Sequence, residues 1–134
     1  MENQPMTRIV SLIKKKRSNP ERTEQIKFVT WLKKQNYKVH HSPNGGRRSL
    51  QEGYLFKMMG TSKGFPDVFV CLRTPVYTGF YCEMKPIKGG KIDPEQAEWL
   101  QCLREQGAFA EVAHGFEEAK KLFLFYLSTI PTAA

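Results

Sequence analysis

The stretch KGFPDVFVCLRTPVYTGFYCEMK, residues 63–85, decides the fold of this chain. It contains two apolar runs, Asp67–Leu72 and Gly79–Lys85, with a turn-rich connection around Pro75. Both runs are rich in Val, Phe and Tyr, which are the residues that favour strands. The stretch therefore predicts a pair of β-strands.

Charged side chains stand at one end of each predicted strand. Asp67 begins the first run, and Glu83 and Lys85 close the second. Because side chains in a strand repeat every two residues, Glu83 and Lys85 share one face, and Asp67 meets them if the strands pair. Two carboxylates, with a backbone carbonyl and waters, bind Mg²⁺ or Mn²⁺. A nearby amine orients a nucleophilic water or stabilises the charge that develops on a phosphodiester.

Each of these residues also has an ordinary structural explanation. Asp67 follows Pro66, and taken alone it is most simply a turn former. Glu83 and Lys85 also fit a solvent-facing strand pair, but the preceding residues are apolar, and charges beside a buried run need a purpose. The combination of the three residues on a basic chain favours a metal site.

Helix signals lie on both sides of this stretch. Asn19-Pro20-Glu21 combines an N-cap, a proline at the first helical position and an acid in the first turn. Capping-box patterns recur at Ser49 and Asp93. The order of elements predicts an α/β fold rather than a bundle or a barrel. Around the strand pair we expect a helix from Asn19 to about Gln35, a strand at Tyr37–His41, helices at Ser49–Met59 and Asp93–Gly107, a strand at Ala108–Ala113 and a last helix at Phe116–Leu127.

The length and charge of the chain suggest one domain with a polyanionic partner. The chain has 134 residues, a formal net charge of +8 and a pI near 9.5. Such an excess of positive charge commonly serves nucleic-acid binding, although a solubility surface or a ribosome-adjacent protein also fits. The basic run Lys14–Arg17 predicts an N-terminal basic arm or short helix over residues 1–18, followed by a single domain over residues 19–134.

Nothing in the sequence indicates a membrane or an oxidising compartment. The three cysteines are widely spaced and lack a C-x-x-C pattern, so we expect reduced thiols. No stretch approaches the length of a membrane span, and the N-terminus lacks the apolar core of a signal peptide. We expect no membrane partner. We expect a cytoplasmic or nucleoid-associated protein, and a phage-encoded protein fits this description too.

With these motifs in order, the chain resembles the virus-type replication-repair nuclease (VRR-NUC) domain, a branch of the PD-(D/E)xK nuclease superfamily. The resemblance runs from about residue 21 to residue 114. Each motif alone is weak, and their combination is specific. The matching pieces are Glu24 on the first helix, Pro43-Asn44-Gly45-Gly46 with Arg47, Lys63-Gly64-Phe65-Pro66-Asp67, Glu83-Met84-Lys85, and Gln96 on the following helix.

The resemblance implies a restriction-endonuclease-like fold, in which helices flank a mixed central sheet. It implies a Mg²⁺- or Mn²⁺-dependent DNA endonuclease, acting as a homodimer on branched DNA such as four-way junctions. Asp67 and Glu83 would bind the metal together with the backbone carbonyl of Met84, and Lys85 would be the catalytic amine.

Two further residues receive roles from the resemblance and also have structural explanations. Glu24 would approach the metal from the first helix, directly or through water. A glutamate early in a helix is equally explained by the helix dipole. Gln96 would touch the site or the nearby backbone, and the capping box explains it as well.

Basic residues between the first strand and Asp67 are candidates for contact with DNA phosphates, because Arg and Lys contacts to the backbone dominate nucleic-acid affinity. The alternative for the group is a solvated loop, and for the asparagine a turn. We do not expect the three histidines to be metal ligands, because they lack ligand spacing. The candidate nucleic-acid-binding residues are Arg47, Arg48, Lys57, Lys63 and Asn44.

Three other functions fit the same sequence. The first is a non-catalytic DNA- or RNA-binding module on a basic α/β domain. The second is a sequence-specific restriction or transposition enzyme of the same superfamily. The third is a Holliday-junction resolvase of another branch. For a dimeric enzyme, the aromatic-rich segment Phe123–Leu127 exceeds what one helix face buries, so part of it is a candidate interface.

Overall fold

The described residues, 19–42 and 49–132 of the computed structural model, form a mixed four-stranded sheet. Its order is β1-β2-β3-β4. β1 pairs antiparallel with β2, β2 pairs antiparallel with β3, and β3 pairs parallel with β4. The strands are β1 (Val39–His41), β2 (Val68–Val70), β3 (Phe80–Lys85) and β4 (Phe109–His114).

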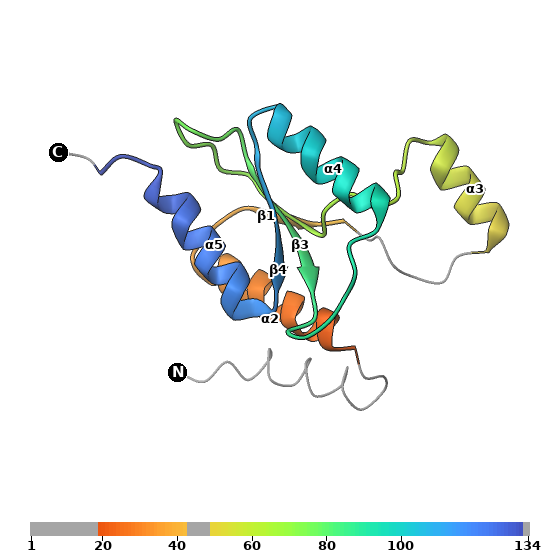
Figure 1. Ribbon diagram of the computed structural model, residues 1–134, viewed down its shortest axis with the longest axis horizontal. Coiled ribbons are helices and arrows are strands. Elements are labelled where there is room, and N and C mark those ends of the chain that lie inside the picture. The colour runs from red at the N-terminus through yellow and green to blue at the C-terminus, as the bar shows by residue number, and fades with distance from the viewer. Residues whose placement is uncertain (1–18, 43–48, 133–134) are drawn as a thin grey trace.

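Helices flank this sheet (Figure 1). α2 and α5 lie together on one face, and α4 lies on the other, where it links the parallel strands β3 and β4. α3 projects away from the sheet, and none of its side chains is buried. The helices are α2 (Pro20–Lys34), α3 (Leu50–Met58), α4 (Pro94–Glu105) and α5 (Phe116–Ser128).

The caps expected from the sequence begin these helices. The side chain of Asn19 accepts a hydrogen bond from the backbone N–H of Arg22 at 3.0 Å, and Pro20 occupies the first turn of α2. The hydroxyl of Ser49 accepts from the N–H of Glu52 at 3.1 Å to begin α3. Each cap satisfies a backbone donor that the helix itself leaves unpaired. The predicted order of elements is confirmed.

An aromatic core lies between the sheet and the pair α2 and α5. Phe80 of β3 is fully buried at its centre. Its ring centroid lies 6.2 Å from that of Phe28 on α2 and 5.1 Å from that of Phe123 on α5. The hydroxyl of Tyr126 donates to the backbone carbonyl of Leu72. Since β3 alternates, burying Phe80 in this core turns Glu83 toward the opposite face.

Two expectations lie outside the described residues. The basic arm predicted at residues 1–18 is one, and the loop that carries Asn44, Arg47 and Arg48 is the other. Among the residues that the structure describes, no helix combines the length and the apolar character needed to cross a membrane.

Candidate active site

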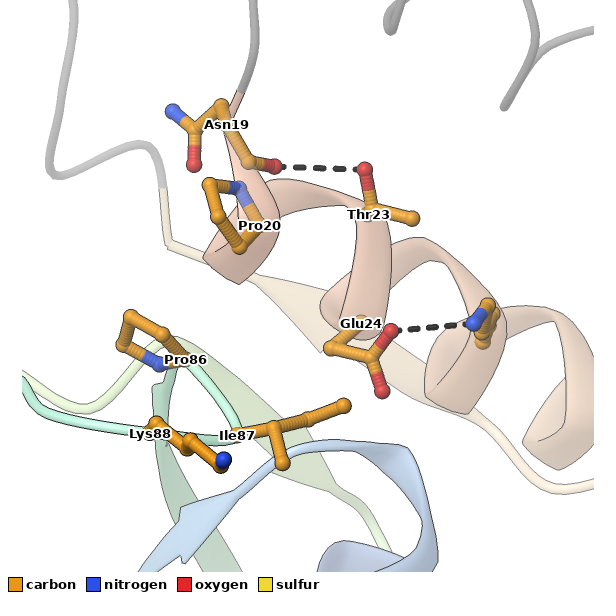
Figure 2. Close-up of a pocket in the computed structure, with 8 residues that line it drawn as sticks. Asn19, Pro20, Thr23, Glu24, Pro86, Ile87 and Lys88 are labelled. Carbon is orange, nitrogen blue, oxygen red and sulfur yellow. Dashed lines mark hydrogen bonds and ion pairs between the residues drawn. The ribbon is translucent and has the colours of Figure 1, made fainter.

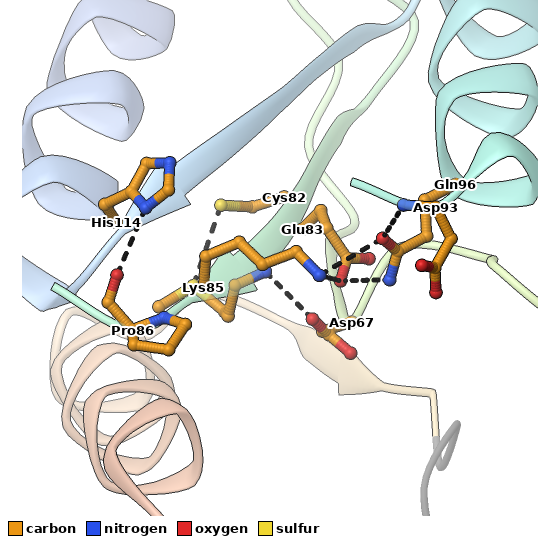
Figure 3. A network of polar contacts seen from close by, with 9 residues as sticks. Asp67, Cys82, Glu83, Lys85, Pro86, Asp93, Gln96 and His114 are labelled. Atoms are coloured by element: carbon orange, nitrogen blue, oxygen red, sulfur yellow. Dashed lines mark hydrogen bonds and ion pairs between the residues drawn. The ribbon is translucent and has the colours of Figure 1, made fainter. Parts of the chain in front are cut away.

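The ends of β2 and β3 bring the predicted acidic residues together. Val68 pairs with Cys82 in an antiparallel register, so Asp67, one residue before β2, lies beside Glu83. A carboxylate oxygen of Asp67 accepts a hydrogen bond of 2.8 Å from the backbone N–H of Met84 (Figure 3). The strands therefore pair as the sequence predicts, and the three residues of the signature converge at one rim of the sheet.

Gln96 of α4 joins the acid and the amine of this signature. Its Nε2 donates to Oε2 of Glu83 at 3.0 Å, and its Oε1 accepts from Nζ of Lys85 at 3.1 Å. Nζ of Lys85 lies 3.8 Å from Oε2 of Glu83. The same Oε1 accepts from the backbone N–H of Asp93 at 2.9 Å. The side chain of Gln96 thus completes the helix cap and contacts the site residues at the same time.

The third carboxylate beside Asp67 and Glu83 belongs to Glu21. Carboxylate oxygens of these three residues lie within 4.8 Å of one another. Glu21 stands in the first turn of α2 and is half-buried. The sequence explains Glu21 as an acid in the first turn of a helix. It does not predict that this carboxylate lies beside Asp67 and Glu83. The rotation of α2 against the sheet, which a single sequence does not fix, brings its carboxylate to the rim.

Glu24, expected to approach the metal, has its carboxylate placed elsewhere by the structure. Its Oε1 accepts a 3.0 Å hydrogen bond from the backbone N–H of Phe116, the first residue of α5. Its Oε2 lies 3.0 Å from Nζ of Lys27. A carboxylate at a helix N-terminus stabilises the unpaired N–H groups and the helix dipole. Glu24 therefore joins α2 to α5, and the carboxylate cluster contains Glu21 in its place.

The electrostatics of the cluster favour a bound cation. Burial raises the pKa of Glu83 to about 9, and the charge of Asp67 and a hydrogen bond with it add to the effect, while Lys85 opposes them. Burial and the charge of Asp67 likewise raise the pKa of Glu21. The positive charge of Lys85 thus offsets only part of the effects that disfavour the charged forms of these carboxylates.

An unpartnered oxygen shows where a cation fits. Oε1 of Glu83 is buried and has no hydrogen-bond partner among the described residues. A buried acceptor without a donor costs free energy, and a divalent ion removes that cost. The donor set of carboxylate oxygens fits Mg²⁺ or Mn²⁺, which prefer oxygen ligands.

The backbone of Met84 also fits the predicted ligand set. Its N–H points toward Asp67, and the N–H and C=O of one strand residue point to the same side. The carbonyl of Lys85, by contrast, accepts from the N–H of Gly115 on the other side. The carbonyl of Met84 therefore points to the side of β3 on which Asp67 lies.

Close packing of the loop before β2 against α4 positions Gln96. Gly64 has a φ of +91°, and a Cβ there would lie 2.7 Å from the backbone carbon of Glu95 and 2.8 Å from the backbone nitrogen of Gln96. The next residue, Phe65, packs edge-on against Trp99 of α4, with ring centroids 4.9 Å apart. Glycine is required at residue 64 because the loop touches the first turn of α4.

A cavity of about 720 Å³ lies near the start of α2 (Figure 2). It separates the start of α2 from the segment that follows β3, directly after Lys85. Lysine side chains in its lining give it positive charge. It is lined by Asn19, Pro20, Thr23, Glu24, Lys27, Pro86, Ile87 and Lys88.

The remaining candidates for DNA contact are two lysines that the structure describes. Lys57 lies in the last turn of α3, and Lys63 lies in the loop that leads to Asp67. Both are exposed. Arg47, Arg48 and Asn44 lie outside the described residues.

Comparison with known proteins agrees with the fold. The family model of the VRR-NUC domain matches residues 4–117. A solved structure described as a "VRR_NUC domain protein" is similar, with a TM-score of 0.73 and 26% sequence identity. The similarity covers 85% of this chain and 93% of that one. No curated protein matches this chain.

The close contact at Gly64 gives a test of how α4 is positioned. We expect Gly64→Ala to lower the free energy of unfolding by about 1–3 kcal/mol beyond the cost of its positive φ, because the new Cβ overlaps the backbone of α4. Urea denaturation measures the change. Gly60→Ala is the matched control, since Gly60 has a φ of +104° and a Cβ there meets nothing within 4 Å. Equal losses in the two variants would contradict the packing argument.

The raised pKa of Glu83 predicts how the metal-free protein responds to pH. The ordinary pKa is 4.5 and the folded one about 9, so between these values the folded protein holds a proton that the unfolded chain has lost. The free energy of unfolding therefore falls as pH rises through this window, by at most about 1.4 kcal/mol per pH unit for one proton. Urea denaturation in chelator measures the slope. Glu83→Gln should flatten it, and an unchanged slope in that variant would assign the proton elsewhere.

Proposed function

Because this chain belongs to the VRR-NUC domain family of nucleases, we propose that it is a metal-dependent DNA endonuclease whose active site contains Glu21, Asp67, Glu83 and Lys85. The observation that carries the proposal is the meeting of three carboxylates within 4.8 Å of one another, with the amine of Lys85 3.8 Å from one of them. The unpartnered oxygen of Glu83 supports a cation at that place.

Each residue of the site has a distinct task in this proposal. Asp67, Glu83 and the carbonyl of Met84 hold Mg²⁺ or Mn²⁺, with Glu21 as the third carboxylate. When bound, such an ion lowers the pKa of a coordinated water and neutralises charge on the phosphodiester. Nζ of Lys85 orients the attacking water or stabilises the negative charge of the transition state.

Gln96 acts on the reaction through the two residues that it contacts. It holds the carboxylate of Glu83 with its nitrogen and the ammonium group of Lys85 with its oxygen. Lysine has a long, flexible side chain, so fixing its amine saves the entropy of ordering it in the transition state. The hydrogen bond from the N–H of Asp93 fixes Gln96 in turn.

The substrate in this proposal is DNA, bound through its phosphates. The net charge of +8 supports a polyanionic partner. In this proposal the exposed Lys57 and Lys63 contact the DNA backbone, together with Arg47, Arg48 and Asn44. Because phosphate binding releases counterions, added salt weakens the complex steeply.

A preference for branched DNA and a homodimeric state complete the proposal. Both come from the family resemblance. Exposed apolar side chains support a protein interface, because a monomer seldom exposes a large apolar patch. On α5 these are Leu124 and Phe125, which are 47% and 53% exposed, and on α3 they are Leu50, Tyr54, Leu55 and Met58, followed by Met59 directly after the helix.

The proposal is tested with a panel of linear, flapped and four-way DNA, incubated with Mg²⁺, Mn²⁺ or chelator. We expect cleavage of branched DNA that chelator abolishes. Asp67→Ala, Glu83→Ala and Lys85→Ala should each lower the rate by about 100-fold or more, with DNA binding retained, because each removes a group that acts on the reacting phosphate. Full activity of Lys85→Ala would overturn the mechanism, and binding without cleavage of any substrate would identify a non-catalytic module.

A matched pair of variants separates the two acids of α2. Glu21→Gln should weaken cleavage, because it removes a charge from the cluster. Glu24→Gln should leave cleavage close to that of the native protein, since glutamine Oε1 still accepts from the N–H of Phe116. The opposite ranking of the two variants would return the role to Glu24.

A further inference from the structure

His41, at the end of β1, touches the backbone of a proposed metal ligand and the helix that carries another. Its Nδ1 lies 3.1 Å from the backbone carbonyl oxygen of Asp67 and 2.7 Å from the side-chain Nε2 of Gln25 on α2. We propose that His41 is a positioning residue of the active site, which joins α2 to the Asp67 peptide and so fixes the separation of Glu21 from Asp67. The inference rests on the proposed metal-dependent function.

The chemistry of the atoms determines how the bridge is made. A carbonyl oxygen only accepts, so Nδ1 of His41 must carry a proton to bond Asp67. A protonated Nδ1 can bond Gln25 only when the carboxamide is turned over, so that Oε1 takes the place of Nε2, and the bridge uses this orientation because the two ends of a carboxamide occupy nearly the same space. One N–H of His41 thus serves two acceptors. The backbone N–H of Ser42 donates to the same carbonyl at 2.9 Å and fixes the Asp67 peptide further.

The bridge acts on Glu21 through the geometry of the helix. Gln25 lies four residues after Glu21, so the two side chains stand one turn apart on the same face of α2. Glu24 joins α2 to α5 instead, since its carboxylate accepts from the N–H of Phe116. His41 therefore joins the face of α2 that carries Glu21 to the sheet.

The bridge opposes the repulsion between two carboxylates. Glu21 and Asp67 place carboxylate oxygens within 4.8 Å of each other, and the charge of Asp67 contributes to the raised pKa of Glu21. In the absence of a cation this repulsion pushes α2 away from β2. A hydrogen-bonded bridge between the two elements opposes it, so that the cluster keeps the separation that a single ion requires.

His40 lacks this placement and gives the matched control. It pairs with Phe69 in the strand register, whereas His41 pairs with Val68. Because side chains alternate, the two histidines point to opposite faces of the sheet. A substitution at His40 therefore removes a histidine from the same strand without touching the bridge.

The test measures Mn²⁺ binding to the DNA-free protein by titration calorimetry and by the spectrum of bound Mn²⁺, with kcat and KM for branched DNA beside it. We expect His41→Leu to weaken Mn²⁺ binding about tenfold and to lower kcat with little change in KM, as loss of an outer hydrogen-bonding partner does in metal sites. His41→Asn should restore both, because its amide nitrogen takes the place of Nδ1. His40→Leu should match the native protein.

The outcomes separate this inference from the function on which it rests. Native Mn²⁺ affinity and native kcat in His41→Leu, beside a loss of both in Asp67→Ala, would overturn the role of His41 and leave the nuclease proposal intact. Failure of the native protein to bind Mn²⁺ and to cleave would overturn both. If His41→Leu does not fold, Gln25→Leu breaks the same bridge from the helix, and native Mn²⁺ affinity in that variant would equally refute the inference.

Discussion

Ionised carboxylates within 4.8 Å of one another repel, and the rim of this sheet brings together the carboxyl groups of Glu21, Asp67 and Glu83. A different contact holds each carboxylate in place. The N–H of Met84 donates to Asp67, and Gln96 donates to Glu83. Glu21 has its position from the docking of α2. Burial in a medium of low dielectric makes both the repulsion and the attraction of a cation stronger than they are in water.

Burial of apolar side chains on one face of the sheet offsets the destabilising effect of the carboxylate cluster. Phe80, Cys82 and Met84 are fully buried on one face of β3, and Glu83 and Lys85 occupy the other. A single strand thus anchors the core and presents the acid and the amine, because its alternation makes the two inseparable. Shifting β3 by one residue along its neighbours would turn its charged side chains into the apolar core and the core side chains to the opposite face, so the register of the strands is strongly determined.

The sequence predicts what depends on local rules and leaves out what depends on packing. The pairing of the two strands, and the meeting of Asp67 with Glu83 and Lys85, follow from a period of two that the backbone imposes. The distinction between Glu21 and Glu24 does not follow, since both suit the first turns of a helix and the rotation of α2 is set by distant contacts of its apolar face. The role of His41 does not follow either, for a related reason. The histidines lack metal-ligand spacing in the sequence, whereas Nδ1 of His41 contacts a backbone carbonyl far along the chain.

Gln96 shows why the structural and functional explanations of one residue need not compete. A capping box requires a side chain at the third helical position to reach back to the cap, and this directs Gln96 toward the sheet rim. A carboxamide has a donor and an acceptor, so it can contact an acid and an amine at once while it completes the cap. A glutamate there would suit the cap equally well, but its charge would add a fourth acid beside Glu83. The charge of the cluster therefore selects glutamine from the two residues that the helix accepts.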